Sequence, residues 1–246
     1  NHEKISLLIM EFLNKEFSGK LSMAIDIFNN NYRKKFLHQL VSGQLDVDRM
    51  DYLKRDTFFT GVSEGSISYE RILKMLHVHN DMLVVEAKGI YSIEKFLIAR
   101  RLMYWQVYLH KTVVSSENLL MNILKRAKEL TFNGEELFAS PALHFFLYNA
   151  IDEHRFVSDL ENTIENFIQL DDNDIISAIK VWTKHPDFIL STLSKWLIDR
   201  VLYRIVIQKN KIDEAIILDL KSKIRSLYPI QESELHYFLF SKNLQK

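Results

Sequence analysis

Apolar residues recur at three- and four-residue spacing along most of the chain, a period typical of helices with one buried face. Only six glycines and three prolines interrupt the 246 residues, so the pattern predicts a mainly α protein. We expect the long helical segment at residues 92–130 to break into two helices near residues 115–116. The predicted helices cover residues 4–16, 21–28, 33–41, 46–61, 68–78, 92–130, 142–151, 158–170, 172–184, 188–198 and 212–227.

A few shorter segments favour strands. Residues 82–86 and 90–91, joined across Lys88 and Gly89, predict a small hairpin. Near the end of the chain, residues 201–208 are rich in β-branched side chains, and residues 236–240 form a second strand candidate. These two segments flank the last predicted helix. We therefore expect a small β-α-β appendage at the C-terminus.

Composition and charge exclude several classes of protein. Lysine plus arginine equals aspartate plus glutamate, at 32 each, so no overall field favours nucleic acid. Cysteine is absent, which excludes disulfides and thiol catalysis and fits a cytoplasmic protein. No run of eighteen uncharged apolar residues predicts a membrane span, and no secretory signal is visible. The first residue is Asn1, and we expect the natural chain to begin upstream of it.

Carboxylates are concentrated in residues 44–56, QLDVDRMDYLKRD. A helix capped near Asp46 would place Asp48, Tyr52 and Asp56 one turn apart on a single face. Such a face can hold a metal ion or a polar ligand. Alternatively, these side chains face water in weak surface pairs, each worth about 0.3–0.5 kcal/mol.

A second string, SIEKFLIARRLMYWQVYLHKTVV at residues 92–114, has a polar face of its own. In a helix, Arg100, Tyr104, Tyr108 and Lys111 would lie on one side. Arginine binds phosphate through a planar fork, and tyrosine can stack on a sugar or donate a hydrogen bond to it. The alternative is that the aromatic side chains belong to the core and the arginine is solvated.

The sequence LDVDRMDYLKRD, followed four residues later by Gly-Val, resembles the last conserved motif of HD-domain metal-dependent phosphohydrolases. The nearest branch is the dNTP triphosphohydrolases, which include dGTPase-like enzymes. The resemblance covers about residues 1–130. It implies the second half of an HD-like helical bundle there, and residues 131–246 would form a helical C-terminal region that ends in the α+β appendage.

The resemblance implies a role for each matching residue. Asp48 corresponds to the aspartate that completes a metal site of two histidines and two aspartates, where the divalent ion would be Mg, Mn, Fe or Zn. Tyr52 and Asp56 correspond to contacts with the deoxyribose and the phosphates. Arg100 corresponds to a phosphate contact, and Tyr108 to a contact on the sugar or base side.

Five further residues match the family less closely. His2 and Glu3 correspond to a catalytic His-Glu pair, in which the histidine assists proton transfer beside the phosphates. The alternative is a frayed chain end. Arg71, Lys88 and Lys111 match basic positions that bind an activating nucleotide between subunits, although most charged surface residues have no specific role.

One departure from the family pattern leaves two functions open. No histidine of the chain is followed by aspartate, so the HD dipeptide and three of the four expected metal ligands are missing. The first hypothesis is a phosphohydrolase that converts a dNTP to deoxynucleoside and triphosphate, for which this chain alone is catalytically incomplete. The second is a non-catalytic nucleotide-binding or oligomerisation module. The resemblance also implies a homo-oligomer, either a dimer or a tetramer.

Overall fold

The computed structural model describes residues 2–208 and 212–242 and confirms the mainly α prediction. The chain forms two compact units, Asn1–His110 and Lys111–Lys246. The assignment of residues 1–130 to the HD domain and of 131–246 to a separate region stays a prediction. Among the described residues, no helix combines the length and the apolarity that crossing a bilayer requires.

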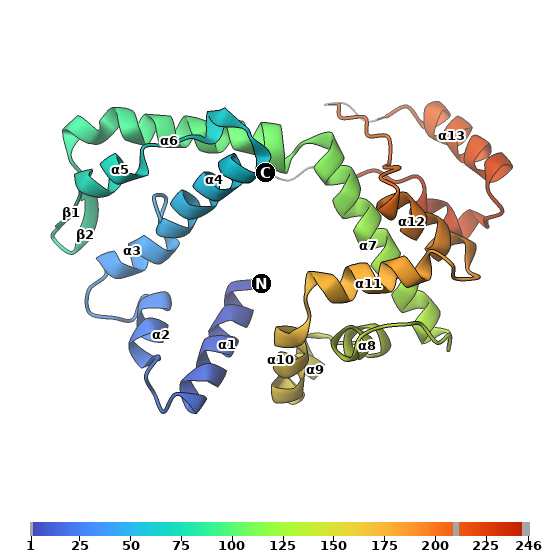
Figure 1. The fold of residues 1–246 in the computed structure, drawn as a ribbon, viewed down its shortest axis with the longest axis horizontal. Coiled ribbons are helices and arrows are strands. Elements are labelled where there is room, and N and C mark those ends of the chain that lie inside the picture. Colours follow the sequence, from blue (N-terminus) through green and yellow to red (C-terminus); the bar gives the residue numbers. More distant parts are fainter. Residues whose placement is uncertain (1, 209–211, 243–246) are drawn as a thin grey trace. The chain divides into compact units, whose positions relative to one another are not determined.

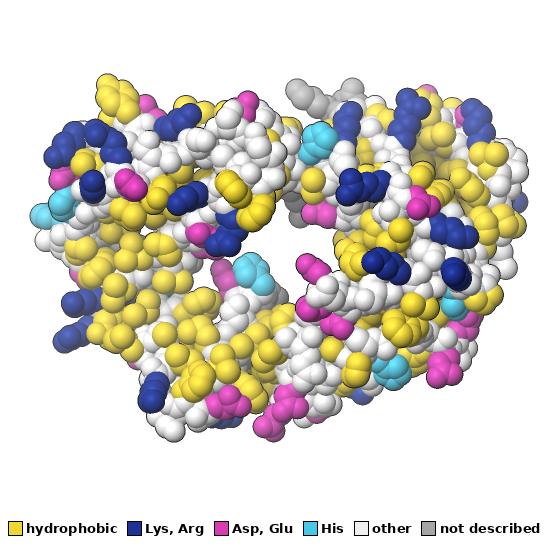
Figure 2. All heavy atoms as spheres, viewed as in Figure 1, with side chains coloured by type: hydrophobic (Ala, Val, Ile, Leu, Met, Phe, Trp, Pro, Cys, Tyr) yellow, Lys and Arg dark blue, Asp and Glu magenta, His cyan; other side chains and the backbone are white. Residues whose placement is uncertain are grey.

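The first unit is a succession of helices with one small hairpin (Figure 1). Each of the first helices packs on the next, from α1 to α4. None of the residues of α1, α2 and α3 is buried, and hydrophobic side chains lie open over this part of the unit (Figure 2). The elements are α1 (His2–Glu16), α2 (Ser22–Phe28), α3 (Phe36–Ser42), α4 (Val47–Thr60), a 3₁₀ turn (Ser63–Gly65), α5 (Tyr69–Met75), β1 (Leu76–His79), β2 (Met82–Val85), a second 3₁₀ turn (Ala87–Gly89), α6 (Ile90–Met103) and a π turn (Tyr104–Tyr108).

Local sequence signals set both ends of α4. The side chain of Asp46 accepts a hydrogen bond from the Arg49 backbone N–H at 2.7 Å, and it is also paired with the Arg49 guanidinium. This arrangement satisfies a free N–H at the start of the helix, as N-cap aspartates do. Gly61 ends the helix with a φ of 71°, a left-handed conformation that glycine adopts without steric cost. The predicted helix therefore forms within one residue of its expected bounds.

The core of the first unit lies where α4, α5 and α6 meet. Its buried side chains are Met50, Leu53, Ile72, Phe96 and Met103. The 3₁₀ turn that follows α4 is held against both α4 and α6. A Cβ atom on its Gly65 would lie 2.1 Å from the Thr57 hydroxyl and 2.7 Å from the Met103 sulfur, so a larger residue there would displace both.

The hairpin forms earlier in the chain than predicted. β1 and β2 are antiparallel, with Leu76 opposite Val85 and His79 opposite Met82. Asn80 and Asp81 both have positive φ, as two-residue turns between twisted strands require. The predicted helix through residue 78 is wrong, because residues 76–79 form β1 and the turn lies at Asn80 and Asp81. The predicted strand at 90–91 is also wrong, because α6 begins at Ile90.

The break between the two long helices also differs from the prediction. α6 passes into the π turn, and the next helix begins at Lys111. Ser115, where a break was expected, is buried inside that helix, and its hydroxyl donates a hydrogen bond to the Tyr203 carbonyl at 3.0 Å. The serine is tolerated in the helix because its hydroxyl finds this acceptor.

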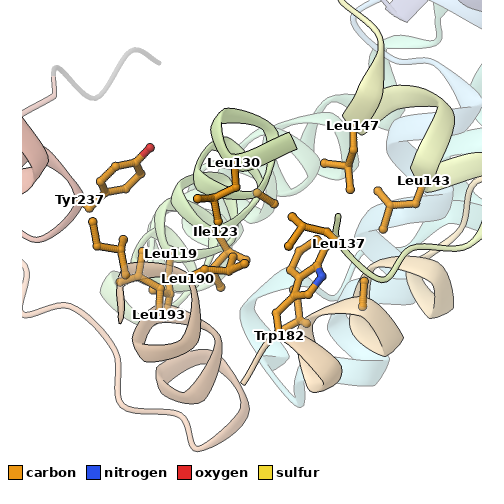
Figure 3. Packing of buried hydrophobic residues seen from close by; sticks show 14 residues of the cluster. Leu119, Ile123, Leu130, Leu137, Leu143, Leu147, Trp182, Leu190, Leu193 and Tyr237 are labelled. Carbon is orange, nitrogen blue, oxygen red and sulfur yellow. The ribbon is translucent and has the colours of Figure 1, made fainter. Parts of the chain in front are cut away.

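The second unit is built around α7, which packs against α8 and α12 (Figure 3). Its core joins Leu119, Ile123 and Leu130 of α7 to Trp182 and Leu190 of later helices. The elements are α7 (Lys111–Phe132), α8 (Pro141–Tyr148), α9 (Glu153–Ser158), α10 (Leu160–Gln169), α11 (Asp172–Trp182), α12 (Phe188–Ile198), α13 (Glu214–Leu227) and a 3₁₀ turn (Glu232–Tyr237).

The predicted β-α-β appendage is wrong in the part of the chain that the structure describes. Residues 201–208 form no strand, and residues 232–237 form a 3₁₀ turn. Leu202 and Tyr203 pack against the core, and the Tyr203 hydroxyl donates to the Tyr237 carbonyl at 2.7 Å. The alternating pattern therefore reflects an irregular segment whose side chains pack on helices, without a neighbouring strand to form a ladder.

A largely buried arginine ties the second unit together. Arg126 of α7 binds Asp187, the N-cap residue of α12, through Nε at 3.1 Å and a terminal nitrogen at 2.6 Å. The same nitrogen donates to Glu234 at 3.2 Å. Burial opposes the ionisation of Asp187, but hydrogen bonds from Arg126 and the Leu190 backbone outweigh it and lower the Asp187 pKa.

We expect Arg126→Met to destabilise the protein by about 1.5–3 kcal/mol, because the variant leaves half-buried carboxylates without their charge-assisted hydrogen bonds. Urea unfolding followed by circular dichroism measures the change. Arg225→Met removes an exposed pair with Glu232 and should cost less than about 1 kcal/mol. Equal losses in the two variants would contradict the role of Arg126.

The same network predicts the direction of acid sensitivity. A lowered folded-state pKa for Asp187 stabilises the protein above the unfolded aspartate pKa of about 3.9, and this contribution is lost as the pH falls through the folded-state value. Asp187→Asn should therefore show a shallower loss of unfolding free energy below about pH 4. Acid unfolding curves that are parallel for the two proteins would contradict this.

Candidate functional site

Two helices of the first unit carry the predicted substrate-binding residues. α4 carries Tyr52 and Asp56, whereas α6 and the π turn carry Arg100 and Tyr108. The two helices pack together, and all four side chains are half-buried. A π turn shifts the side chains that follow it around the helix axis, and such turns are frequent at functional sites. Here the turn ends at Tyr108.

One hydrogen bond joins the two helices within this cluster. The Tyr108 hydroxyl donates to the Asp56 carboxylate at 2.5 Å, between residues 52 positions apart in sequence. Burial of the phenol and its bond to the Asp56 carboxylate together raise the pKa of Tyr108. Tyr108 therefore keeps its proton at neutral pH and acts as a hydrogen-bond donor.

Tyr52, Tyr104 and Arg100 complete the cluster. The Tyr52 and Tyr104 rings meet the Tyr108 ring edge-on, with centroids at 6.1 and 5.1 Å. The Arg100 guanidinium lies 5.8 Å from the Tyr104 centroid and is hydrogen-bonded to the Tyr52 hydroxyl. Burial raises the pKa of Tyr52, and the positive charge of Arg100 opposes that rise. The cluster thus offers one cation, one carboxylate and several phenols to a polar ligand.

Asp48 lies apart from these interactions. Its side chain is exposed, and it makes no hydrogen bond or ion pair with a described residue. Within residues 2–208 and 212–242, no group of three or more His, Cys, Asp or Glu side chains could hold a metal ion. The residues present therefore do not fit a metal centre by themselves. The two aspartates of the Asp-Val-Asp triplet differ, because Asp46 caps the helix and Asp48 faces solvent.

His2 and Glu3 lie in the first turn of α1, and both are exposed. α1 packs on α2, and His2 makes no hydrogen bond with a described residue. The catalytic role of His2 and Glu3 stays a prediction from the resemblance.

Two of the three predicted activator-binding residues lie together. The Arg71 guanidinium donates to the Lys88 carbonyl at 3.3 Å, while the Lys88 ammonium lies 2.6 Å from Glu86. Hydrogen bonds from Lys88 and then from His77 lower the pKa of Glu86. Lys111 begins α7, in the second unit.

Tyr104, which helical spacing places on the Arg100 face, joins the cluster, although the resemblance assigns it no role. No sequence pattern predicts the π turn.

Residues 67–142 match the family described as the HD associated region. A crystal structure of a phosphohydrolase from Bacteroides thetaiotaomicron is 58% identical, with a TM-score of 0.93 over 96% of this chain and 59% of that one. The uncharacterized protein YwfO of Bacillus subtilis is 34% identical over 80% of this chain and 43% of its own length.

A more distant relative is named the deoxynucleoside triphosphate triphosphohydrolase SAMHD1 homolog of Dictyostelium discoideum. It is 23% identical over 56% of this chain and 29% of its own length. The chain spans less than half the length of these two curated relatives. Residues 67–142 therefore match the HD associated region, and the chain is similar to proteins named as a phosphohydrolase and as a deoxynucleoside triphosphate triphosphohydrolase homolog.

Proposed function

We propose that the cluster on α4 and α6 is the substrate-binding part of a metal-dependent phosphohydrolase that converts a dNTP to deoxynucleoside and triphosphate. The observation that carries this proposal is the hydrogen bond between Tyr108 and Asp56, which brings two separate motifs into one cluster with Arg100. The names of the similar proteins, a phosphohydrolase and a deoxynucleoside triphosphate triphosphohydrolase, support the same chemistry.

The charges within the cluster suggest how a nucleotide is oriented. The Arg100 guanidinium can bind phosphate oxygens through its fork of N–H donors. The Asp56 carboxylate repels phosphate but accepts hydrogen bonds from sugar hydroxyls. The proposal therefore places the phosphates at Arg100 and the sugar near Asp56, with the phenols of Tyr52 and Tyr108 donating between them. A sugar hydroxyl of the ligand would replace the Tyr108 hydroxyl as the hydrogen-bond donor to Asp56.

The proposal assigns only one metal ligand, Asp48, to the described residues. Asp48 can supply one oxygen ligand to a divalent cation, and its exposure leaves it accessible. Because the described residues hold no metal-binding group, the remaining ligands would have to be supplied from beyond the described residues. The identity of the ion, among Mg, Mn, Fe and Zn, is not specified by a single carboxylate.

A second candidate function is a non-catalytic nucleotide-binding or oligomerisation module. The observation that favours it is the lack of a metal-binding group in the described part of the chain. The enzyme and a nucleotide-binding module both require nucleotide binding at the cluster, whereas an oligomerisation module does not. Only the enzyme releases triphosphate. Binding and turnover experiments therefore separate them.

For nucleotide binding, we expect Arg100→Met to weaken the affinity of the chain for dNTPs by about tenfold or more, since a charge-assisted phosphate contact is lost. Isothermal titration calorimetry measures the dissociation constant. Arg55→Met is the matched control, because Arg55 lies on α4 and is exposed and paired with Asp51. Equal affinities for wild type and Arg100→Met would reject the cluster as a phosphate site.

For the hydrogen bond itself, we expect Tyr108→Phe to remove part of the alkaline sensitivity of stability. The raised folded-state pKa of Tyr108 stabilises the protein below the unfolded tyrosine pKa of about 10, and this contribution is lost as the pH rises through the folded-state value. Unfolding free energies measured as the pH rises above about 10 should therefore fall less steeply in the variant. Parallel curves for the two proteins would contradict the burial of the Tyr108 phenol and its hydrogen bond to Asp56.

For turnover, the intact protein, with any residues beyond this sequence, is assayed with dNTPs and Mn or Mg for release of triphosphate. Asp48→Ala should abolish the activity because a proposed metal ligand is removed. Asp51→Ala is the control, as Asp51 is exposed on α4 and pairs only weakly with Arg55. Full activity in Asp48→Ala would overturn the metal role, and an inactive wild type that still binds dNTPs would favour the second candidate.

A further inference from the structure

A 3₁₀ turn packs against both helices that carry the candidate site. The turn comprises Ser63–Gly65 and contacts α4 and α6. Gly65 is buried, and a Cβ atom added to it would lie 2.1 Å from the Thr57 hydroxyl and 2.7 Å from the Met103 sulfur. Non-bonded carbon atoms pack at about 3.5–4.0 Å, so only a residue without a side chain lets the turn come this close to both helices.

The two side chains that lie against Gly65 are adjacent in sequence to the candidate site. Thr57 follows Asp56 in α4, and Met103 ends α6 immediately before the π turn that ends at Tyr108. Met103 is fully buried, and Tyr108 packs against the same apolar cluster. A change in the distance between Thr57 and Met103 therefore moves Asp56 relative to Tyr108.

A polar contact also attaches the turn to the candidate site. A hydrogen bond from its own backbone N–H and one from the Gln106 side chain lower the pKa of the Glu64 carboxyl. Gln106 lies in the π turn that ends at Tyr108. The Ser63–Gly65 turn is therefore bonded to the segment that presents Tyr108, and it follows in the chain after the helix that presents Asp56.

We propose that Gly65 is a positioning residue for the candidate site, because its lack of a side chain sets the spacing of α4 and α6 at which the Tyr108 hydroxyl reaches the Asp56 carboxylate. An added methyl group would push Thr57 and Met103 apart. The bond from Tyr108 to Asp56 is 2.5 Å long, and hydrogen bonds between oxygens are lost beyond about 3 Å. The inference rests on the proposed function, since the cluster needs this geometry only if it binds a ligand.

The test follows the Tyr108 phenol in the intact protein by nuclear magnetic resonance, with tyrosine labelled with ¹³C at Cζ and Tyr108→Phe to assign the signal. Burial and the bond to Asp56 raise the pKa of Tyr108, so in the wild type its signal should titrate above the ordinary tyrosine value of about 10. In Gly65→Ala the signal should titrate at lower pH, toward that value. The affinity for dNTPs, measured by isothermal titration calorimetry, should fall by about tenfold.

A second substitution tests whether the steric conflict is the cause. The Thr57 hydroxyl is buried and makes no hydrogen bond with a described residue, so Thr57→Ala frees space for the added methyl group without breaking a described hydrogen bond. The flexible Met103 side chain can adjust to the remainder. The Gly65→Ala/Thr57→Ala double variant should therefore recover the wild-type titration and most of the affinity. The matched control is Ser66→Thr, which adds a methyl group to the exposed neighbouring residue and should change neither measurement.

Circular dichroism shows which variants fold. A folded Gly65→Ala variant in which Tyr108 titrates as in wild type would overturn the inference, as would a folded double variant that does not recover. If Gly65→Ala is unfolded, the double variant decides. A double variant that is unfolded too would overturn the inference, because the conflict with Thr57 would then not be what the substitution costs.

The titrations need no nucleotide, so they separate this inference from the proposed function. If the wild type binds dNTPs but Tyr108 does not respond to Gly65→Ala, only the role of Gly65 fails. If the titrations behave as expected but the wild type binds no dNTP, the proposed function fails while Gly65 still sets the bond between Tyr108 and Asp56.

Discussion

The apolar packing of α4 on α6 positions the residues of the candidate site in the first unit. Leu53 and Phe96 are fully buried where these helices meet, and the cluster of tyrosines stands at the edge of the same contact. If this apolar contact were lost, Asp56 and Tyr108 would have no reason to meet, because a single hydrogen bond contributes only about 1 kcal/mol. The hydrophobic core therefore positions the polar site, and the hydrogen bond sets its final geometry.

Charged groups are used differently in the two units. In the second unit, Arg126 is satisfied on several sides by carboxylates, and such a closed network contributes to stability and leaves little to bind a ligand. In the first unit, Arg100 meets only phenols among its described partners and remains half-buried. A guanidinium without a carboxylate partner is suited to an anion from solution. This contrast supports binding at the first cluster.

α6 serves two surfaces at once. Its inner side carries the core and, toward its end, Arg100 and the approach to the π turn, while its outer side carries the exposed side chains of Leu97 and Ile98. Tyr104 belongs to both regions, since it contacts Tyr108 in the cluster and is partly exposed at the end of the outer face.

The sequence by itself determined the features that depend on neighbours in the chain. The Asp46 cap, the Gly61 end and the one-turn spacing of Tyr52 and Asp56 are local properties of α4. Tertiary structure decided the rest. Residues 201–208 alternate like a strand but pack on helices, and Asp56 meets Tyr108 from 52 positions away. Periodicity specifies which face of an element is apolar, but only the packing of distant segments determines what that face contacts.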